Sequence, residues 1–252
     1  MNREIIGIKR VTSAAGVHKA TLTMGRKPRY ALAMSDEALD LVVFDLDGTL
    51  VDSLPDIAAA LNHALATHGL QVQPTEVVAT LVGHGILALA ESALELQSNK
   101  SVSPHDLSQS IWQRYLAQPC VLTKPYEGIN EALEALKQRG VPVAVLTNKP
   151  GDVARLVLAA LNLNEGFTAV IGDGDGFPRK PAPAALAGLM ARVDARPERT
   201  LMVGDAVPDV QVARAAGCIA VAALWGYSRR AVLLEQQPDY AVMSPRQILD
   251  LP

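Results

Sequence analysis

The chain has 252 residues, a length that suits one large domain or a main domain with a smaller inserted one. Hydrophobic residues make up 49% of the chain but aromatic residues only 4%, so a large core must consist of Ala, Val and Leu. This composition favours buried parallel strands covered by helices over an aromatic-rich β-sandwich. Two isolated cysteines, Cys120 and Cys218, exclude a disulfide framework and a cysteine-based zinc site.

The net charge of −3 is unevenly distributed along the chain. Residues 1–33 contain seven basic residues and one acidic residue, whereas the rest of the chain has 16 basic and 25 acidic groups. The acidic remainder has no basic field that would attract nucleic acid. No apolar run approaches the roughly 18 residues of a membrane span. We therefore expect a cytoplasmic protein with no nucleic-acid or membrane partner.

We interpret residues 1–38 as a basic N-terminal extension that is poorly ordered. The apolar residues of 1–33 have no sustained period, and Met34 is a plausible alternative start. A poorly ordered leader or an over-long gene prediction explains these features best. A basic targeting segment and an accessory strand around residues 5–8 stay open as alternatives.

The first half of the remaining chain is mostly helical in pattern. Residues 41–44 form a short apolar run that predicts a buried strand. Helices are predicted at about 55–68, 75–97 and 104–117, and strand signals are missing between residues 55 and 125. We therefore expect residues 55–125 to form a smaller, all-helical inserted domain.

Strands and helices alternate in the second half of the chain. The pattern predicts helices at 128–139, 152–162, 183–191 and 208–216, and strands at 143–146, 169–171, 200–203, 219–223 and 240–242. This alternation indicates an α/β core with a doubly wound, parallel, Rossmann-like sheet, made of residues 39–54 and 126–252. In such sheets, ligands bind at the carboxyl ends of the strands.

Polar side chains follow three of the predicted strands. Asp45 and Asp47 come after 41–44, Thr147 and Asn148 follow 143–146, and Gly204, Asp205 and Asp209 follow 200–203. Lys180 lies in a loop just before a predicted helix. Taken singly, each motif is usually a turn, a loop or a helix cap. Their joint occurrence at one edge of a sheet favours a single site.

The chemistry that this set allows is phosphoryl transfer. A carboxylate such as Asp45 can attack phosphorus and form an aspartyl-phosphate if a cation shields the charge of the ester. Mg²⁺ suits this role, with Asp45, Asp205 and the backbone carbonyl of Asp47 as oxygen ligands. A protonated Asp47 could act as the general acid for the leaving oxygen and then as the base for water.

The remaining groups fit the same reaction. Thr147 and the backbones of Asn148 and Gly48 could donate hydrogen bonds to the phosphoryl oxygens. Lys180 could neutralise the negative charge that builds up during transfer.

These residues resemble the motifs of the haloacid dehalogenase superfamily. The four motifs are Asp45-Leu46-Asp47-Gly48-Thr49, Thr147-Asn148, Lys180-Pro181, and Gly204-Asp205 with Asp209. The resemblance covers residues 39–252. It implies that Asp45 is the nucleophile, Asp47 the acid/base, and Asp205 with Asp209 part of the magnesium site. The superfamily's dehalogenases lack a second acid where Asp47 stands, which favours phosphoryl transfer. Ala206 departs from the Ser that many relatives have after Gly-Asp.

The inserted helical domain (residues 55–125) resembles the superfamily's cap, which closes over the site and selects small molecules. Within it, Gly83, His84 and Gly85 are candidate substrate-binding residues, because the glycines permit close backbone approach to a ligand and His84 could contact an anionic group. An ordinary polar loop residue is the equally open alternative for His84.

Longer stretches look like phosphoglycolate phosphatases in particular, although this subgroup more often has Asn in place of His84. They are Pro125-Tyr126-Glu127-Gly128, Thr147-Asn148-Lys149-Pro150, Arg179-Lys180-Pro181 and Trp225-Gly226-Tyr227-Ser228. The resemblance implies 2-phosphoglycolate as the substrate, with glycolate and phosphate as products. Another small phosphate ester, a sugar phosphomutase and a non-catalytic phosphate-binding module are the alternatives. The sequence leaves open whether the protein is a monomer or a homodimer.

Overall fold

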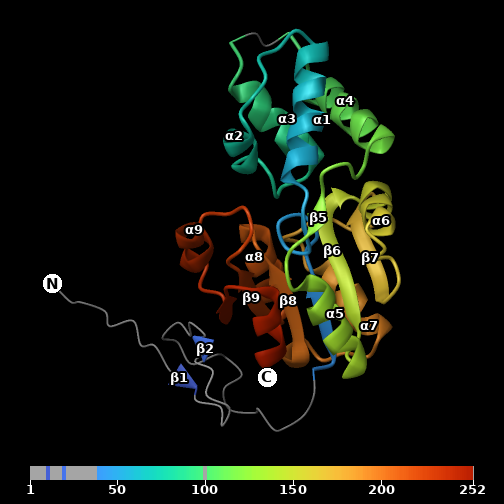
Figure 1. Ribbon diagram of the computed structural model, residues 1–252, viewed down its shortest axis with the longest axis vertical. Helices are drawn as coiled ribbons and strands as arrows, with labels where there is room; N and C mark the ends of the chain where they lie inside the picture. The colour runs from blue at the N-terminus through green and yellow to red at the C-terminus, as the bar shows by residue number, and fades with distance from the viewer. Residues whose placement is uncertain (1–9, 12–18, 21–38, 99–100, 252) are drawn as a thin grey trace, which may run out of the picture.

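The computed structural model describes residues 10–11, 19–20, 39–98 and 101–251, and its centre is a six-stranded sheet (Figure 1). Every neighbouring pair in this sheet is parallel, and the strand order is β10-β9-β8-β3-β6-β7. The strands are β3 (Leu41–Phe44), β6 (Val143–Pro150), β7 (Phe167–Asp173), β8 (Thr200–Gly204), β9 (Ile219–Ala223) and β10 (Tyr240–Val242). The predicted α/β fold with a doubly wound parallel sheet is confirmed.

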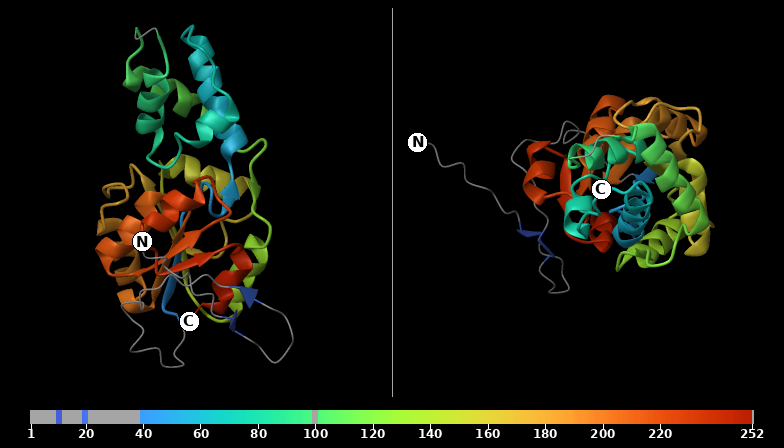
Figure 2. Two further views of the ribbon diagram at one scale, coloured as in Figure 1. Left: turned by 90° about the vertical axis from the view of Figure 1, so that its left-hand side faces the viewer. Right: turned by 90° about the horizontal axis from the view of Figure 1, so that it is seen from above.

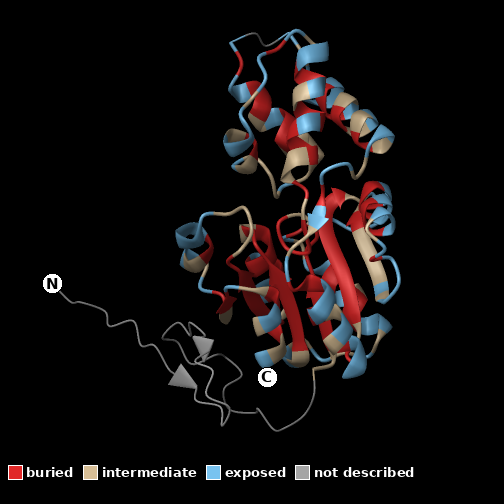
Figure 3. Ribbon diagram, in the orientation of Figure 1, coloured by how far each residue is buried: buried red, intermediate tan, exposed pale blue. Residues whose placement is uncertain are grey.

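The strand β3 shows why the sheet is covered on both faces. All four of its residues are fully buried, and their side chains alternate between two hydrophobic clusters. Val42 and Phe44 pack with the helices α5 (Ile129–Gln138) and α6 (Gly151–Ala160). Leu41 and Val43 pack with α7 (Ala184–Arg192), α8 (Val207–Ala216) and α9 (Arg230–Glu235). Figure 3 shows the buried strands between partly exposed helices.

The four helices that the structure describes between β4 (Val51–Asp52) and β5 (Lys124–Pro125), which we call the cap, lie beyond the carboxyl ends of the strands (Figures 1 and 2). They are α1 (Leu54–Thr67), α2 (Thr75–Ala79), α3 (Ile86–Glu95) and α4 (Pro104–Ala117). Buried leucines of α1 and α4 belong to the same hydrophobic cluster as Phe44, so the core continues into the cap. The helical pattern predicted at about 75–97 forms two helices, because α2 ends at Ala79 and α3 begins at Ile86. Between them, Gly83 (φ 118°) and Gly85 (φ 91°) have positive φ values that do not occur within a helix.

The cap joins the core through two short paired strands. β4 (Val51–Asp52) and β5 (Lys124–Pro125) are antiparallel, so the chain leaves the core and returns to it at adjacent points. Beside this junction, the buried carboxylate of Asp56 on α1 accepts hydrogen bonds from the N–H groups of Val121, Leu122 and Thr123 and from the Thr123 hydroxyl. The first turn of the cap is thereby fixed to the segment that leads back to the core.

Several elements differ from the sequence prediction. β6 and β7 extend beyond the predicted 143–146 and 169–171, and α9, β4 and β5 were not predicted. The structure also has 3₁₀ helices at Pro197–Arg199 and Pro245–Asp250. Of residues 1–38, only an antiparallel pair of two-residue strands, β1 (Arg10–Val11) and β2 (Lys19–Ala20), is described. The other expectations for 1–38 lie outside the described residues.

In the described part of the chain, no helix combines the length and the apolar character that a membrane crossing requires.

Candidate active site

Three adjacent strands of the sheet bring the predicted site residues together. β3 lies between β6 and β8, so Asp45 after β3 lies beside Thr147 and Asn148 on β6 and beside Asp205 after β8. After β3, the chain adds β6 and β7 on one side of that strand and then returns to add β8 on its other side. This is the topological switch point at which open α/β sheets bind ligands.

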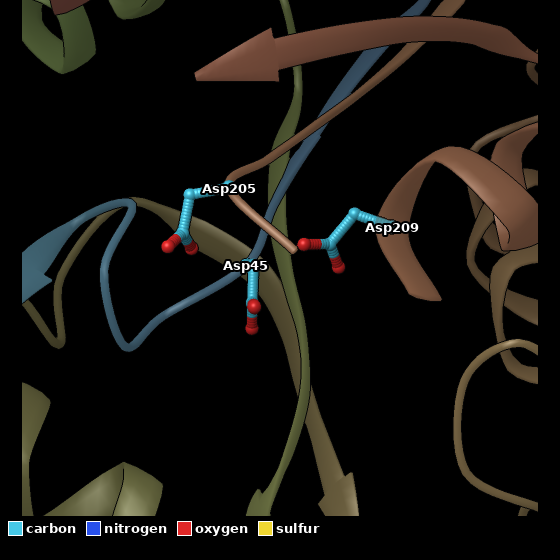
Figure 4. Close-up of side chains that lie close together, drawn as sticks. All are labelled: Asp45, Asp205 and Asp209. Atoms are coloured by element: carbon cyan, nitrogen blue, oxygen red, sulfur yellow. The ribbon is translucent and has the colours of Figure 1, made fainter. Parts of the chain in front are cut away.

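The centre of the site is a cluster of three carboxylates from Asp45, Asp205 and Asp209 (Figure 4). One oxygen of each lies within 4.8 Å of the others, and each residue is at most 6% exposed. The buried ammonium of Lys180 lies 2.9 Å from Asp45 Oδ1 and 2.7 Å from Asp209 Oδ1. A single lysine therefore faces two of the three acids.

The electrostatics of this cluster favour an added cation. Burial, and then the charges of Asp209 and Asp47, raise the pKa of Asp45 to about 7 against the opposing effect of Lys180. Burial and the charges of Asp45 and Asp209 raise the pKa of Asp205 to about 8. Burial and the repulsion between neighbouring carboxylates both disfavour the charged forms, and a cation held between these carboxylates would offset both effects. All of the donors are carboxylate oxygens, which suits Mg²⁺.

Asp209 is already engaged within the protein. Its Oδ1 accepts from Lys180, and its Oδ2 accepts the backbone N–H of Ala206 at 2.9 Å. Both oxygens of Asp209 therefore have partners within the protein, and its predicted metal role stays a prediction.

Asp205 is held by groups from two distant loops. Its carboxylate accepts from the Thr49 hydroxyl at 3.0 Å and from the Tyr227 backbone N–H at 2.8 Å. A Cβ atom on Gly48 or on Gly226 would lie within 2.5 Å of this side chain, so both positions require glycine. The stretch Trp225–Ser228, noted in the sequence only as a resemblance, therefore positions a site carboxylate.

The Asp47 carboxylate is paired with Lys149 and Ser53. The Lys149 ammonium lies 2.9 Å and 3.1 Å from its two oxygens, and the Ser53 hydroxyl donates to Oδ1. Both side chains that form the ion pair are nearly buried, at 6% and 12% exposure. Lys149 and Ser53 were not among the predicted site residues, although Lys149 directly follows Asn148 in the stretch Thr147-Asn148-Lys149-Pro150.

Asn148 connects the two halves of the site. Its side chain accepts from the Lys180 N–H at 2.9 Å, and its amide donates to the carbonyls of Lys180 and of Gly83 in the cap. The neighbouring Thr147 hydroxyl accepts from the Lys149 N–H at 3.2 Å, which leaves its own O–H free to donate to a ligand.

A small cavity of about 70 Å³ lies between the cap and the core. Its polar lining comes from Asp45, Asp47, Thr147, Asn148 and Lys149, and most of its apolar lining comes from the cap. Gly83 and Gly85 lie in the cavity wall, and their predicted contact with substrate stays a prediction.

Five predicted site residues stand outside the lining of this cavity: Gly48, His84, Lys180, Asp205 and Asp209. His84 is exposed, and its carbonyl accepts from Arg179 at 3.3 Å, so its proposed contact with substrate stays a prediction. Lys180 and Asp205 are buried behind Asp45. They can therefore act on a ligand in the cavity through Asp45 and through a shared cation.

This fold and site define a phosphatase, a hydrolase of phosphoric monoesters. Residues 42–223 match the family model of the haloacid dehalogenase-like hydrolases, and the chain belongs to this family. It is 36% identical to the phosphoglycolate phosphatases of Haemophilus influenzae strain 86-028NP and Aquifex aeolicus strain VF5. Each alignment covers 84% of this chain, together with 97% and 95% of the relative.

Solved structures agree with this assignment. The crystal structure of a predicted phosphoglycolate phosphatase from Haemophilus somnus 129PT superposes with a TM-score of 0.80 at 30% identity. That alignment covers 86% of this chain and 99% of the other.

Proposed function

We propose that the protein is a magnesium-dependent phosphatase that hydrolyses 2-phosphoglycolate through an aspartyl-phosphate on Asp45. The observation that carries the proposal is the buried cluster of Asp45, Asp205 and Asp209 with Lys180, located beside Asp47 at the switch point of the sheet. Relatives that bear the name phosphoglycolate phosphatase support the choice of substrate.

In the first step, a carboxylate oxygen of Asp45 attacks phosphorus and the bond from phosphorus to the glycolate oxygen breaks. Protonated Asp47 gives its proton to that oxygen, so glycolate leaves as the alcohol. In the second step, Asp47 takes a proton from water, which attacks phosphorus and releases inorganic phosphate while Asp45 is regenerated.

The other residues hold the reacting groups in place. Lys180 positions Asp45 and offsets part of the negative charge that develops during transfer. Thr147 can donate a hydrogen bond to the phosphoryl oxygens. Asp45 and Asp205 would hold Mg²⁺, which would offset negative charge on the ester and on the carboxylates.

The test measures phosphate release from 2-phosphoglycolate with Mg²⁺ and with EDTA. We expect activity with Mg²⁺, its loss in EDTA, and a fall of at least roughly 1,000-fold in Asp45→Asn. Acid quenching with radiolabelled ester should trap label on the wild-type protein and none on Asp45→Asn. Undiminished phosphate release by Asp45→Asn would overturn the mechanism. Asp173→Asn, a partly exposed acid outside the cluster, is the matched control and should retain activity.

A second candidate substrate class is favoured by the apolar part of the cavity. Ile57, Ile86, Leu89 and Ile111 line it, which suits a leaving group with more hydrocarbon than glycolate has. A panel of small phosphate esters, compared by kcat/KM under the same conditions, distinguishes the two candidates. A higher value for an alkyl ester than for 2-phosphoglycolate would favour the second.

A further inference from the structure

Tyr115 and Lys149 meet at the wall of the cavity, one from each half of the protein. Tyr115 belongs to α4 of the cap and Lys149 to β6 of the core, and both line the cavity. The Lys149 ammonium lies 4.1 Å from the centre of the Tyr115 ring. The ammonium therefore lies over the face of the ring.

The Tyr115 hydroxyl is a buried polar group without a partner. The residue is 5% exposed, and its oxygen forms no hydrogen bond with any residue of the described chain. Buried polar side-chain atoms are nearly always hydrogen-bonded, so an exception beside a ligand cavity points to a bound acceptor. Burial raises the pKa of Tyr115 to about 12, so the hydroxyl keeps its proton and can donate.

The surroundings favour an acceptor with a negative charge. Lys149 supplies a buried positive charge next to the ring, and the cap side of the cavity is largely apolar. In such a water-poor environment, an anion gains more from a nearby ammonium than it would in water. The charge lies close to the reacting atoms, because Lys149 is hydrogen-bonded to Asp47, the proposed acid for the leaving oxygen.

We propose that the Tyr115 hydroxyl and the Lys149 ammonium bind the carboxylate of the substrate and so select phosphorylated hydroxy acids over esters without a carboxylate. This inference rests on the proposed function and deepens it by assigning the recognition of the leaving group. In 2-phosphoglycolate, one methylene group separates the carboxylate from the ester oxygen. A leaving oxygen at Asp47 thus places the carboxylate beside Lys149.

The subsite is complete only when cap and core are arranged as in this structure. Tyr115 would then recognise the leaving group from the cap while Lys149 recognises it from the core. A carboxylate that bridges the two would favour the arrangement in which Asp45 is shielded from water.

The test compares Tyr115→Phe with the wild type on matched pairs of esters: 2-phosphoglycolate with ethyl phosphate, and 2-phospholactate with isopropyl phosphate. The variant should reduce the ratio of kcat/KM between the carboxylated ester and its partner by roughly 10- to 100-fold, as expected for a hydrogen bond to a charged group. Tyr240→Phe, on the edge strand β10, is the matched control and should leave the ratio unchanged.

Thermal unfolding without substrate separates recognition from structure. Because Tyr115→Phe removes a hydroxyl that has no partner, its Tm should equal or exceed that of the wild type. A lower Tm, or an equal loss of kcat/KM for both members of each pair, would overturn the proposed subsite.

The same measurements distinguish failure of the proposed function from failure of the proposed carboxylate subsite. If the wild type prefers 2-phospholactate to 2-phosphoglycolate but still favours the carboxylated member of each pair, the proposed substrate fails and the subsite stands. If it favours neither carboxylated ester, the subsite fails. If it hydrolyses no ester, the proposed function fails, and calorimetric titration with 2-phosphoglycolate decides the subsite. In that titration, Tyr115→Phe must weaken binding by the same 10- to 100-fold, and equal affinity would overturn the subsite.

Discussion

A Cβ atom on Gly48 would lie 2.4 Å from the Asp205 carboxylate, and Gly48 itself has a left-handed backbone with φ of 81°. Gly48→Ala should therefore displace Asp205 and strain the turn after β3. We expect kcat/KM to fall by at least about 100-fold, comparable to losing a preorganised charged group from an active site. The measurement is steady-state kinetics on 2-phosphoglycolate.

Gly69→Ala is the control that separates backbone strain from the steric clash with Asp205. Gly69 has a similar φ of 66°, but no atom lies within 4 Å of the position that its Cβ would take. We expect this variant to lose about 1 kcal/mol of stability while it retains activity. Comparable loss of activity in both variants would show that displacement of Asp205 is not the cause.

The excess negative charge of the carboxylate cluster predicts that Mg²⁺ stabilises the folded protein. At a concentration 100 times its Kd, the ion should add about 2.7 kcal/mol to the free energy of unfolding. EDTA should remove this gain, and Asp205→Asn should reduce it. Differential scanning calorimetry at several Mg²⁺ concentrations measures the effect. A Tm of the wild type that does not change with Mg²⁺ would contradict the metal site.

The buried pair of Lys149 and Asp47 gives a stability prediction. Lys149→Met leaves the Asp47 carboxylate without its bidentate partner and should cost about 3–5 kcal/mol. Asp47→Asn in the same background removes the uncompensated charge and should restore part of this loss. Urea unfolding of the two single variants and the double variant gives the coupling free energy. Strict additivity of the single losses would show that the pair contributes nothing.

The hydrogen-bonded carboxylate of Asp56 leads to a prediction of how the free energy of unfolding changes in acid. Burial acts to raise the pKa of Asp56, but hydrogen bonds from the Thr123 hydroxyl and from the backbone N–H groups of residues 121–123 outweigh it, and the pKa lies below its ordinary value. The charged form therefore stabilises the protein above the unfolded-state pKa of about 3.9, and this contribution is lost as the pH falls through the folded-state pKa.

Asp56→Asn should thus be less stable than the wild type by about 1–3 kcal/mol near neutral pH, with a difference that shrinks in acid. Urea unfolding of both proteins from pH 7 to pH 3 measures this difference. Glu131→Gln, which alters an exposed carboxylate paired with Arg246, is the control and should show little change. A difference that is constant with pH would indicate that the carboxylate charge is not the cause.

The sheet and the convergence of Asp45, Thr147 and Asp205 could be predicted from the sequence because each rests on local patterns. Buried parallel strands are continuous apolar runs, and polar groups after them must lie at one edge of the sheet. The limits of the helices were less predictable. The apolar spacing of 75–97 continues across Gly83 and Gly85, whose positive φ values and contacts with Asn148 and Arg179 belong to the assembled structure.

The pairing of Asp47 with Lys149 and the position of Tyr115 could not be predicted for a different reason. Both depend on where the cap packs against the core. Tyr115 lies 34 positions before Lys149 in the sequence, and β5 and α5 lie between them. A tyrosine on an amphipathic helix is normally a core residue. Its unpartnered hydroxyl and its place beside Lys149 become visible only once the elements are assembled.

The paired strands β4 and β5 bring the two ends of the cap insertion to neighbouring positions on the core. In the path of the chain, the whole insertion is one loop whose two ends are fixed side by side at this pair of strands. Recombination between relatives could therefore exchange the segment from Asp52 to Lys124 without altering the strands that carry the aspartates. We therefore expect a cap taken from a relative to change which ester is hydrolysed, while the aspartates at the strand ends keep their positions.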